Sequence, residues 1–544
     1  MEKHKPSGLR RRVPALLLCA VLLLSAAACG RDEPSGAAFT EGPRFTVAVA
    51  QTPDSLNPVL SEGGLAEEFF LLSYDPLWRL DASGQPQACI AEDWSLSSDR
   101  LTWTVRLRKD AVFSDGVPVT AADVVFSYEL MRHSDTIYSD YFDGITVIRQ
   151  PDDYTVVIST SYVKGDMLYN PTPILPKHIW QSYEFSPGSF ENLELVGSGP
   201  FVYDPEASGE NGWSFRGRAD YFGGAPKIGE LYFERYGTVT GAARAVSAGE
   251  ADASFGLSDV QLTTLESVPG VELIQAVLPG ADCMVLALNC QADFFKNTAM
   301  RQAVEYSADR AWFMSMAVGG AGMTGSSFMS PGLDGFAVPE GLRGYSPDTA
   351  LGLLRSAGYA DVDEDGILEY GIRETELSLR MYSSSLDDWS ATAATILAAD
   401  LGEIGIQVNW RKTDGSAADA CRGDENWDMC LLTFRCSVGA SVTAARFMEE
   451  LGTLTGWEDA AFLGDLDTLR SAEDSSVARG YVRRLQQTAY DACPVVVLGY
   501  RADIQAIRSD AWTGYEDQLA GSGLFRVGSA DLYMNVEPRD TINN

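Results

Sequence analysis

Histidine is scarce in this chain, and so are the sequence signatures of catalysis. Only 3 of the 544 residues are histidine, and just His133 and His178 lie beyond the N-terminal leader. No G-x-S-x-G elbow, H-E-x-x-H helix or phosphate-binding P-loop occurs in the sequence. A haem or nickel site built on a histidine pair therefore has little support. We expect a chain that is not an enzyme and carries no cofactor.

Positive charge is also in short supply. The chain has 41 Lys and Arg against 76 Asp and Glu, which gives a formal net charge of −35. Such an acidic surface repels phosphate backbones, so we expect no nucleic acid partner. Acid pairs such as Glu67 and Glu68 are attributed to this general acidity. After the leader, no segment approaches the roughly 20 consecutive apolar residues that a membrane-spanning helix needs.

The N-terminus has the order of an export signal. Basic residues precede an apolar stretch over 13–24, and small residues then lead to Ala28 and Cys29. We predict a lipoprotein signal peptide over 1–29, with Cys29 as the lipid anchor. The alternative is an ordinary cleaved signal in which Cys29 has no role. Residues 30–42, rich in Gly, Pro and polar residues, predict a flexible tether. In either case we expect an extracytoplasmic protein.

Seven cysteines follow Cys29, and an odd number excludes a complete disulfide framework. Export permits disulfides, and Cys283 with Cys290 or Cys430 with Cys436 could each close a small loop. Buried free thiols are the expected state for most of the seven. No paired C-x2-C of a zinc site is present among Cys421 and its neighbours.

Length and periodicity predict a multidomain α/β protein. A chain of this size exceeds a single core, so two or three domains are expected. Alternation over 101–107 predicts a strand, and Thr120 with Asp123 predicts a capping box that starts a helix. One helix is expected over 297–316. Another over 389–404 runs through Gly405 into a strand, a join typical of α/β layers.

Short blocks spread over nearly the whole chain after the leader resemble one family, the family 5 extracellular solute-binding proteins, which serve dipeptide, oligopeptide and nickel importers. The blocks are 53–58 (PDSLNP), 91–94 (AEDW), 101–127, 174–179 (ILPKHI), 196–201 (VGSGPF), 219–227 (ADYFGGAPK), 248–252 (AGEAD), 286–289 (LALN), 300–304 (MRQAV), 345–348 (YSPD) and 353–359 (LLRSAGY).

The resemblance implies a type II periplasmic-binding-protein-like clamp, in which two α/β lobes close on a ligand about a hinge. Lobe I would comprise 43–65, 193–283 and 503–544. An extra α+β domain on lobe I would occupy 66–192, and lobe II would occupy 284–502. The protein is expected to be a monomer that hands its solute to an ABC permease and its ATPase.

The resemblance also suggests candidate ligand-binding residues near the end of one strand of lobe II. Peptide binders of the family end this strand with an aromatic residue, here Phe434, and shortly afterwards place an aspartate that holds the peptide ammonium. That position falls near Ser437, whose neutral hydroxyl cannot supply a charge-assisted bond worth ~1.5–3 kcal/mol. Arg435 and Cys436 lie between them. Arg435 would suit a carboxylate if it faces the cleft; a solvent-facing side chain is the alternative.

Asn289 and Tyr382 complete the candidate set. The region of Tyr382 lacks the arginine that peptide binders often use for the peptide carboxylate, because none occurs between Met381 and Trp389. Ordinary peptide specificity is therefore in doubt.

A calcium-like loop is the last candidate. Asp361, Asp363 and Asp365 copy the start of a calcium loop, but its twelfth position is Ile372 rather than Glu. No metal is therefore expected.

The predicted function is delivery of a small peptide-like or carboxylate-bearing solute to an ABC import system. A binding protein for a nickel chelate or another non-peptide solute is one alternative. A sensory ligand-binding protein is a second, and a secreted hydrolase on a similar shell is a third.

Overall fold

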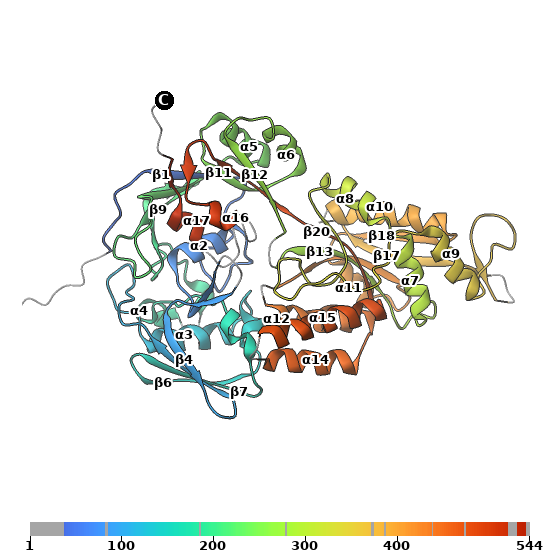
Figure 1. Ribbon diagram of the computed structural model, residues 1–544, viewed down its shortest axis with the longest axis horizontal. Helices are drawn as coiled ribbons and strands as arrows, with labels where there is room; N and C mark the ends of the chain where they lie inside the picture. The colour runs from blue at the N-terminus through green and yellow to red at the C-terminus, as the bar shows by residue number, and fades with distance from the viewer. Residues whose placement is uncertain are drawn as a thin grey trace, which may run out of the picture.

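The computed structural model shows a molecule of two large sheets and a smaller domain (Figure 1). The predicted signal peptide with Cys29, and the first part of the tether, lie outside the described residues. The structure describes residues 37–81, 85–183, 186–277, 280–371, 375–385, 388–437, 439–472, 475–519 and 530–539.

Lobe I is built on a seven-stranded sheet of order β12-β21-β11-β1-β10-β9-β8. Helix α2 (Leu65–Ser73) packs on this sheet through Phe69, whose ring centroid lies 4.9 Å from that of Phe215 and 5.1 Å from that of Phe233. Helices α5 (Val239–Ala248) and α6 (Asp259–Leu265) contribute to a second apolar cluster of this lobe. The strands are β1 (Arg44–Val49), β8 (Phe201–Gly209), β9 (Gly212–Gly217), β10 (Glu230–Arg235), β11 (Ala253–Leu257), β12 (Val271–Ala276) and β21 (Asp503–Arg508).

Lobe II is built on a six-stranded sheet of order β14-β20-β13-β19-β17-β18. Alternate residues of its central strand β13 enter two different cores, Met284 and Leu286 in one and Cys283 and Val285 in the other, as the pleat requires. The strands are β13 (Asp282–Leu288), β14 (Gly322–Thr324), β17 (Ser378–Ser384), β18 (Gln407–Thr413), β19 (Met429–Arg435) and β20 (Val495–Arg501).

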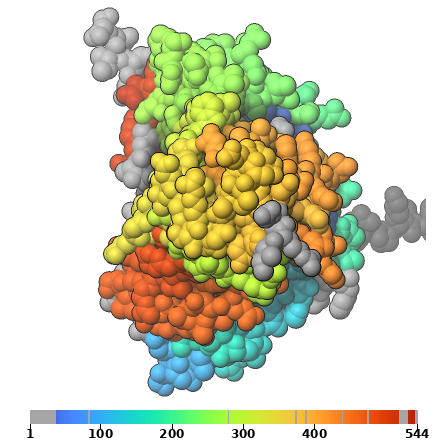
Figure 2. All heavy atoms as spheres, turned by 90° about the vertical axis from the view of Figure 1, so that its right-hand side faces the viewer, coloured from blue at the N-terminus to red at the C-terminus, as the bar shows by residue number. Residues whose placement is uncertain are grey.

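Helices cover both faces of this sheet. Figure 2, seen from the lobe II side, shows the segments around α9 and α10 nearest the viewer and the later helices below them. The first core takes α7 (Thr298–Ser307), α8 (Arg310–Val318), α9 (Pro347–Ser356) and α10 (Asp388–Glu403), and the second takes α12 (Ala440–Arg446), α14 (Ala460–Ser471) and α15 (Ser475–Ala492).

Two expectations for these helices can be judged. The single helix expected over 297–316 is wrong, because the Asp309 carboxylate accepts the Trp312 backbone N–H at 2.8 Å and caps a new helix, α8. The helix–Gly–strand join is confirmed, since α10 is followed by Gly405 at φ +79° and then by β18. A side chain at that positive φ would be strained.

The extra domain carries a four-stranded sheet of order β4-β5-β7-β6, on which α3 packs. The predicted capping box is confirmed, with the Thr120 and Asp123 side chains each accepting from the other's backbone. The strand predicted over 101–107 is confirmed as β5; its Trp103, Val105 and Leu107 are buried, whereas Leu101 just before it is half-buried. The elements are β4 (Ala91–Leu96), β5 (Thr102–Leu107), α3 (Ala121–Arg132), η1 (Ser139–Phe142), β6 (Ile145–Asp152), β7 (Thr155–Thr160), η2 (Gly165–Tyr169) and α4 (Lys177–Trp180).

Short elements fill the connections between the main sheets. They are β2 (Trp78–Leu80), β3 (Pro86–Ala88), η3 (Gln181–Tyr183), η4 (Pro187–Ser189), β15 (Glu369–Tyr370), β16 (Thr375–Glu376), α11 (Ala417–Arg422), η5 (Phe447–Gly452), α13 (Thr453–Thr455), β22 (Trp512–Thr513), α16 (Glu516–Leu519), α17 (Asp531–Asn535) and β23 (Glu537–Pro538).

Two segments connect the large sheets, one from β12 to β13 and one through Ala502 from β20 to β21. These connections correct two predicted boundaries. The boundary after Cys283 falls inside β13, which begins at Asp282 and belongs to the lobe II sheet. The boundary at 66 would cut α2, whose Phe69 packs on the lobe I sheet.

Candidate functional site: the cleft between the lobes

A cavity of about 510 Å³ lies between lobe I, the extra domain and lobe II, within the size range of small-molecule sites. Helix α2 forms its lobe I wall, and β2, η1 and η2 contribute the wall of the extra domain. The end of β19 and α12 supply the lobe II side. Its aromatic lining consists of Phe70, Tyr74, Trp78, Tyr138, Tyr141, Tyr169 and Phe255.

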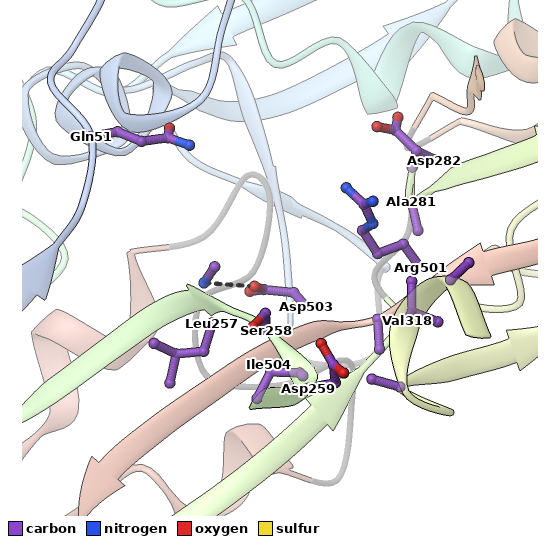
Figure 3. Close-up of a pocket in the computed structure, with 15 residues that line it drawn as sticks. Gln51, Leu257, Ser258, Asp259, Ala281, Asp282, Val318, Arg501, Asp503 and Ile504 are labelled. Atoms are coloured by element: carbon purple, nitrogen blue, oxygen red, sulfur yellow. Dashed lines mark hydrogen bonds between the residues drawn. The ribbon is translucent and has the colours of Figure 1, made fainter. Parts of the chain in front are cut away.

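A second chamber of about 540 Å³ adjoins the first where the chain crosses between the lobes. Figure 3 shows Gln51 reaching toward this chamber from the side opposite Arg501 and Asp282. Asp503 lines both chambers, and its carboxylate accepts the Gly256 backbone N–H at 2.8 Å. Gln51, Gly256 and Gly280 also line both chambers. The two hollows therefore form one elongated cleft beside the crossing segments.

The lobe I wall of the cleft is acidic. Burial raises the pKa of Glu67, an effect partly offset by the Gly64 N–H and by Arg435. Burial raises the pKa of Glu68 to about 7, although the Tyr533 hydroxyl donates a hydrogen bond to its carboxylate at 2.8 Å. Burial also raises the pKa of Asp503. The approach of a cation would stabilise the ionised form of these three carboxyl groups.

The lobe II side carries arginines instead. Arg435 ends β19 with its side chain 64% exposed and lies 3.6 Å from the Asp282 carboxylate. The positive charge of Arg435 also acts on Glu67 and partly offsets the rise in the pKa of that carboxyl group. Arg446 on α12 lines the same cavity and donates to the Arg435 carbonyl at 3.3 Å. Arg435 and Arg446 therefore face Glu67, Glu68 and Asp503 across the cleft, which Arg79 of β2 and Asp282 of β13 also line.

Polar contacts join lobe II to the extra domain beside the cleft. Arg446 forms an ion pair with Asp140, and Arg470 lies 3.3 Å from Asp143. The Ser441 hydroxyl donates to Asp166 at 2.8 Å. These contacts hold the two walls of the cavity against each other.

Three predicted site residues line this cavity, and they are consecutive: Arg435, Cys436 and Ser437. Phe434 does not line it. Its side chain is wholly buried in the lobe II core, with its ring 6.1 Å from that of Phe447. Because side chains alternate along a strand, Phe434 points into the core, so a ligand contact is ruled out for it.

Asn289 and Tyr382 also lie away from the cavity. Asn289 follows β13 at the end opposite Asp282, about 20 Å along the strand, and its amide donates to the Trp427 carbonyl at 2.9 Å. Tyr382 packs in a small core cluster and its hydroxyl donates to Asp424 at 2.7 Å. The structure gives both residues structural roles instead of the predicted ligand contacts.

The predicted calcium-like loop lies in lobe II, and none of its residues lines the cleft chambers. Asp361, Asp363 and Asp365 gather with Glu369, their ligand oxygens lying within 4.8 Å of one another. Glu369 accepts the Val362 backbone N–H at 2.7 Å.

Sequence reasoning missed Glu67 and Glu68, which it attributed to general acidity. One signal could have identified them. Both lie inside an otherwise apolar helix, α2, that directly follows the pair Gly63 and Gly64. Acids within such a segment carry a cost of burial that a solvent-exposed pair does not.

A search of the described residues finds no helix with the length and apolar character needed to cross a bilayer.

Comparison with known proteins agrees with this architecture. Residues 85–445 match the family model described as bacterial extracellular solute-binding proteins, family 5 Middle. The oligopeptide-binding protein AppA of Bacillus subtilis is 23% identical over 77% of this chain and 80% of the relative. The nickel-binding periplasmic protein of Escherichia coli is 24% identical over 78% and 79%.

Solved structures share the fold. HbpA2 from Haemophilus parasuis superposes with a TM-score of 0.77 at 17% identity, covering 91% of this chain and all of that one. AppA from Bacillus subtilis in complex with a nonapeptide gives 0.69 at 20% identity, covering 92% of this chain and all of AppA.

These findings confirm the expected type II periplasmic-binding-protein fold. They also confirm the expectation that the chain is not an enzyme, because its relatives are substrate-binding proteins of ABC transporters. Family members work outside the cytoplasm or in the periplasm. With two thirds of its length matched by the family model and a two-lobed cleft in place, the chain belongs to the bacterial extracellular solute-binding proteins of family 5.

Proposed function

We propose that this solute-binding protein is anchored to the cell membrane through a lipidated Cys29 and delivers a small, peptide-like, carboxylate-bearing solute to an ABC permease and its ATPase. The observation that carries the choice of solute is the position of Arg435 on the lobe II wall, beside Ser437. The side chain of Arg435 is 64% exposed, and its planar guanidinium suits a carboxylate, whereas Ser437 brings no negative charge to pair with an ammonium.

The polarity of the cleft supports a ligand with two charged ends. A carboxylate near Arg435 would place the rest of a short ligand along the aromatic lining. Its cationic end would then approach Glu67 and Glu68 on α2. Apolar and aromatic walls would supply the burial, and closure of the lobes would exclude water.

The expected result is saturable binding of a tripeptide with free ends, together with compaction of the mature protein in small-angle X-ray scattering. Amidation of the ligand's carboxyl end should weaken binding, by calorimetry, by about 10- to 100-fold, the equivalent of one charge-assisted hydrogen bond of ~1.5–3 kcal/mol. The Arg435→Gln variant should lose the same factor for the free carboxylate. It should bind the amide as the native protein does.

Arg355→Gln is the matched control, since Arg355 is an exposed residue of α9 that does not line the cleft. Equal binding of acid and amide would contradict the role of Arg435. Binding of a nickel–histidine chelate, with no peptide bound, would favour the non-peptide alternative. The only described histidines, His133 and His178, do not line the cavity.

The anchor has a separate test. In cells that export the protein, Cys29→Ser should move most of it from the membrane pellet to the soluble fraction. The variant would lose its covalent lipid, and the described residues include no helix long and apolar enough to cross a bilayer. Metabolic labelling with a fatty acid should disappear in the same variant. If Cys29→Ser sediments as the native protein does, and the native protein takes up no labelled fatty acid, the alternative of an ordinary cleaved signal is supported instead.

A further inference from the structure

Arg79 is a cationic side chain on the extra-domain wall of the cleft. It is the middle residue of β2 and lies opposite Gln87 of β3 in the antiparallel pair. Its side chain is half-buried and lines the cavity of about 510 Å³. Apolar residues of the same wall line the cavity with it, among them Leu80 beside it in the chain and Leu168 of η2, which packs against β2.

The hydrogen bonding of Arg79 differs from that of the other arginines in this cavity. Arg435 lies 3.6 Å from Asp282, and Arg446 forms an ion pair with Asp140. In the described part of the chain, no group accepts a hydrogen bond from the Arg79 side chain or forms an ion pair with it. A guanidinium stays charged and carries several N–H donors. Its partial burial without a partner costs free energy that an anionic ligand would offset.

Two carboxyl groups, those of Asp75 and Asp531, act electrostatically on Arg79 without contact. Asp75 is 4% exposed and already accepts the Tyr221 hydroxyl at 2.8 Å and the Ser198 hydroxyl at 3.1 Å. Neither acid lines the cavity. An anionic group inside the cavity could therefore reach Arg79 without displacing either carboxylate.

The charged groups of the cleft follow an order that suits a ligand with three charges. The charge of Arg435 acts on Glu67, at the start of α2. The next residue, Glu68, is hydrogen-bonded to α17, and Asp531 of the same short helix acts on Arg79. This arrangement places the two acids of α2 between the two guanidinium groups.

We propose that Arg79 binds a second carboxylate of the solute, so that the preferred ligand is a short acidic peptide. This inference rests on the proposed function and names the class of peptide. The carboxyl end of the peptide lies at Arg435 and its ammonium at Glu67 and Glu68. The side-chain carboxylate of an N-terminal Glu or Asp lies at Arg79, where the planar guanidinium can donate two parallel hydrogen bonds.

The N-terminal position of the acidic residue follows from the chemistry of the peptide. The ammonium and the first side chain start from the same Cα atom. A peptide whose ammonium meets Glu68 therefore carries its first side chain toward the neighbouring part of the wall. An acidic side chain at the carboxyl end would instead lie on the side of Arg435.

Calorimetric titration of the mature protein with Glu-Ala-Ala and Gln-Ala-Ala tests this assignment. The two tripeptides have the same length and differ in the charge of one side chain. The native protein should bind Glu-Ala-Ala about 10- to 100-fold more tightly, the factor expected for one charge-assisted pair. Ala-Ala-Glu should bind no more tightly than Ala-Ala-Gln. These comparisons need no variant, so they hold even if a substitution disturbs folding.

Variants then assign the preference to one side chain. Arg79→Gln should bind both peptides as the native protein binds Gln-Ala-Ala. Arg79→Lys keeps the charge but lacks the planar fork, and should retain part of the preference. Arg435→Gln should weaken both peptides by the same factor and leave their ratio unchanged. Arg149→Gln is the matched control and should change neither affinity, since Arg149 is an exposed residue of β6 that does not line the cleft.

Glutarate, which has two carboxylates and no peptide group, separates this assignment from the proposed function. Equal binding of Glu-Ala-Ala and Gln-Ala-Ala, or a preference that survives in Arg79→Gln, overturns the role of Arg79 and leaves peptide delivery intact. If neither peptide binds but glutarate does, and Arg79→Gln abolishes that binding, the carboxylate site stands and the peptide is wrong. Glutarate binding that Arg79→Gln leaves unchanged, or no binding of any of the three probes, overturns the assignment.

Discussion

The Glu305→Gln variant should lose about 3–5 kcal/mol of lobe II stability, the usual cost of breaking a buried ion pair on one side only. Glu305 is 3% exposed and pairs with two arginines, Arg310 and Arg343, which are themselves buried. It also accepts the Cys493 thiol. Glutamine keeps the shape but removes the charge, so two guanidinium groups would stay in the core without their carboxylate.

Thermal unfolding followed by calorimetry checks this expectation, and the lobe II transition should fall by on the order of 10 °C. Asp293→Asn is the control. Asp293 pairs with Lys296 on the surface, where the two side chains are 99% and 59% exposed, and such pairs add little stability. A Glu305→Gln transition that matches the control would show that the two arginines find other partners.

A second large effect concerns pH. Glu68 has a folded-state pKa of about 7 against a usual value of 4.5, because burial disfavours its charged form. Between about pH 4.5 and pH 7 the folded protein holds a proton that the unfolded chain has lost. The free energy of unfolding therefore decreases as pH rises through this window. Above pH 7 the ionised carboxylate should cost about 2 kcal/mol, since the group is partly open to the cleft.

Glu68→Gln should remove this cost. The variant keeps an oxygen that can accept the Tyr533 hydroxyl but cannot ionise. Urea unfolding without ligand should show little difference from the native protein at pH 4.5 and a gain of about 2 kcal/mol at pH 8. Glu376→Gln, at an exposed position of β16, should shift neither value. A difference that does not change with pH would show that Glu68 titrates normally.

Much of the scaffold could be predicted from local patterns. The Thr120 and Asp123 capping box, the strand β5 and the turn at Gly405 all depend on a few neighbouring residues. The split between α7 and α8 was missed. Residues 297–316 are compatible with one continuous helix, and their local pattern does not indicate that Asp309 caps a new helix.

Only some of the residues that line the cavity could be predicted from local patterns. Arg435, Cys436 and Ser437 were found because they follow a strand end that resembles the family pattern, and all three line the cavity. Phe434 was misplaced, because its direction depends on which face of β19 meets the helices of the second core. Glu67 and Glu68 were overlooked, because the groups around them come from distant parts of the chain: Tyr533 and Asp503 for Glu68, and Arg435 for Glu67.

By itself, the sequence determined the class of fold, the family and the absence of catalytic motifs, because each of these can be recognised from short contiguous segments of the chain. Only the tertiary structure decided which carboxyls oppose Arg435. The physical reason is that the cleft is assembled from segments as distant as α2 and β19. Burial, charge and contact at such a site are properties of the packed chain, and no local pattern specifies them.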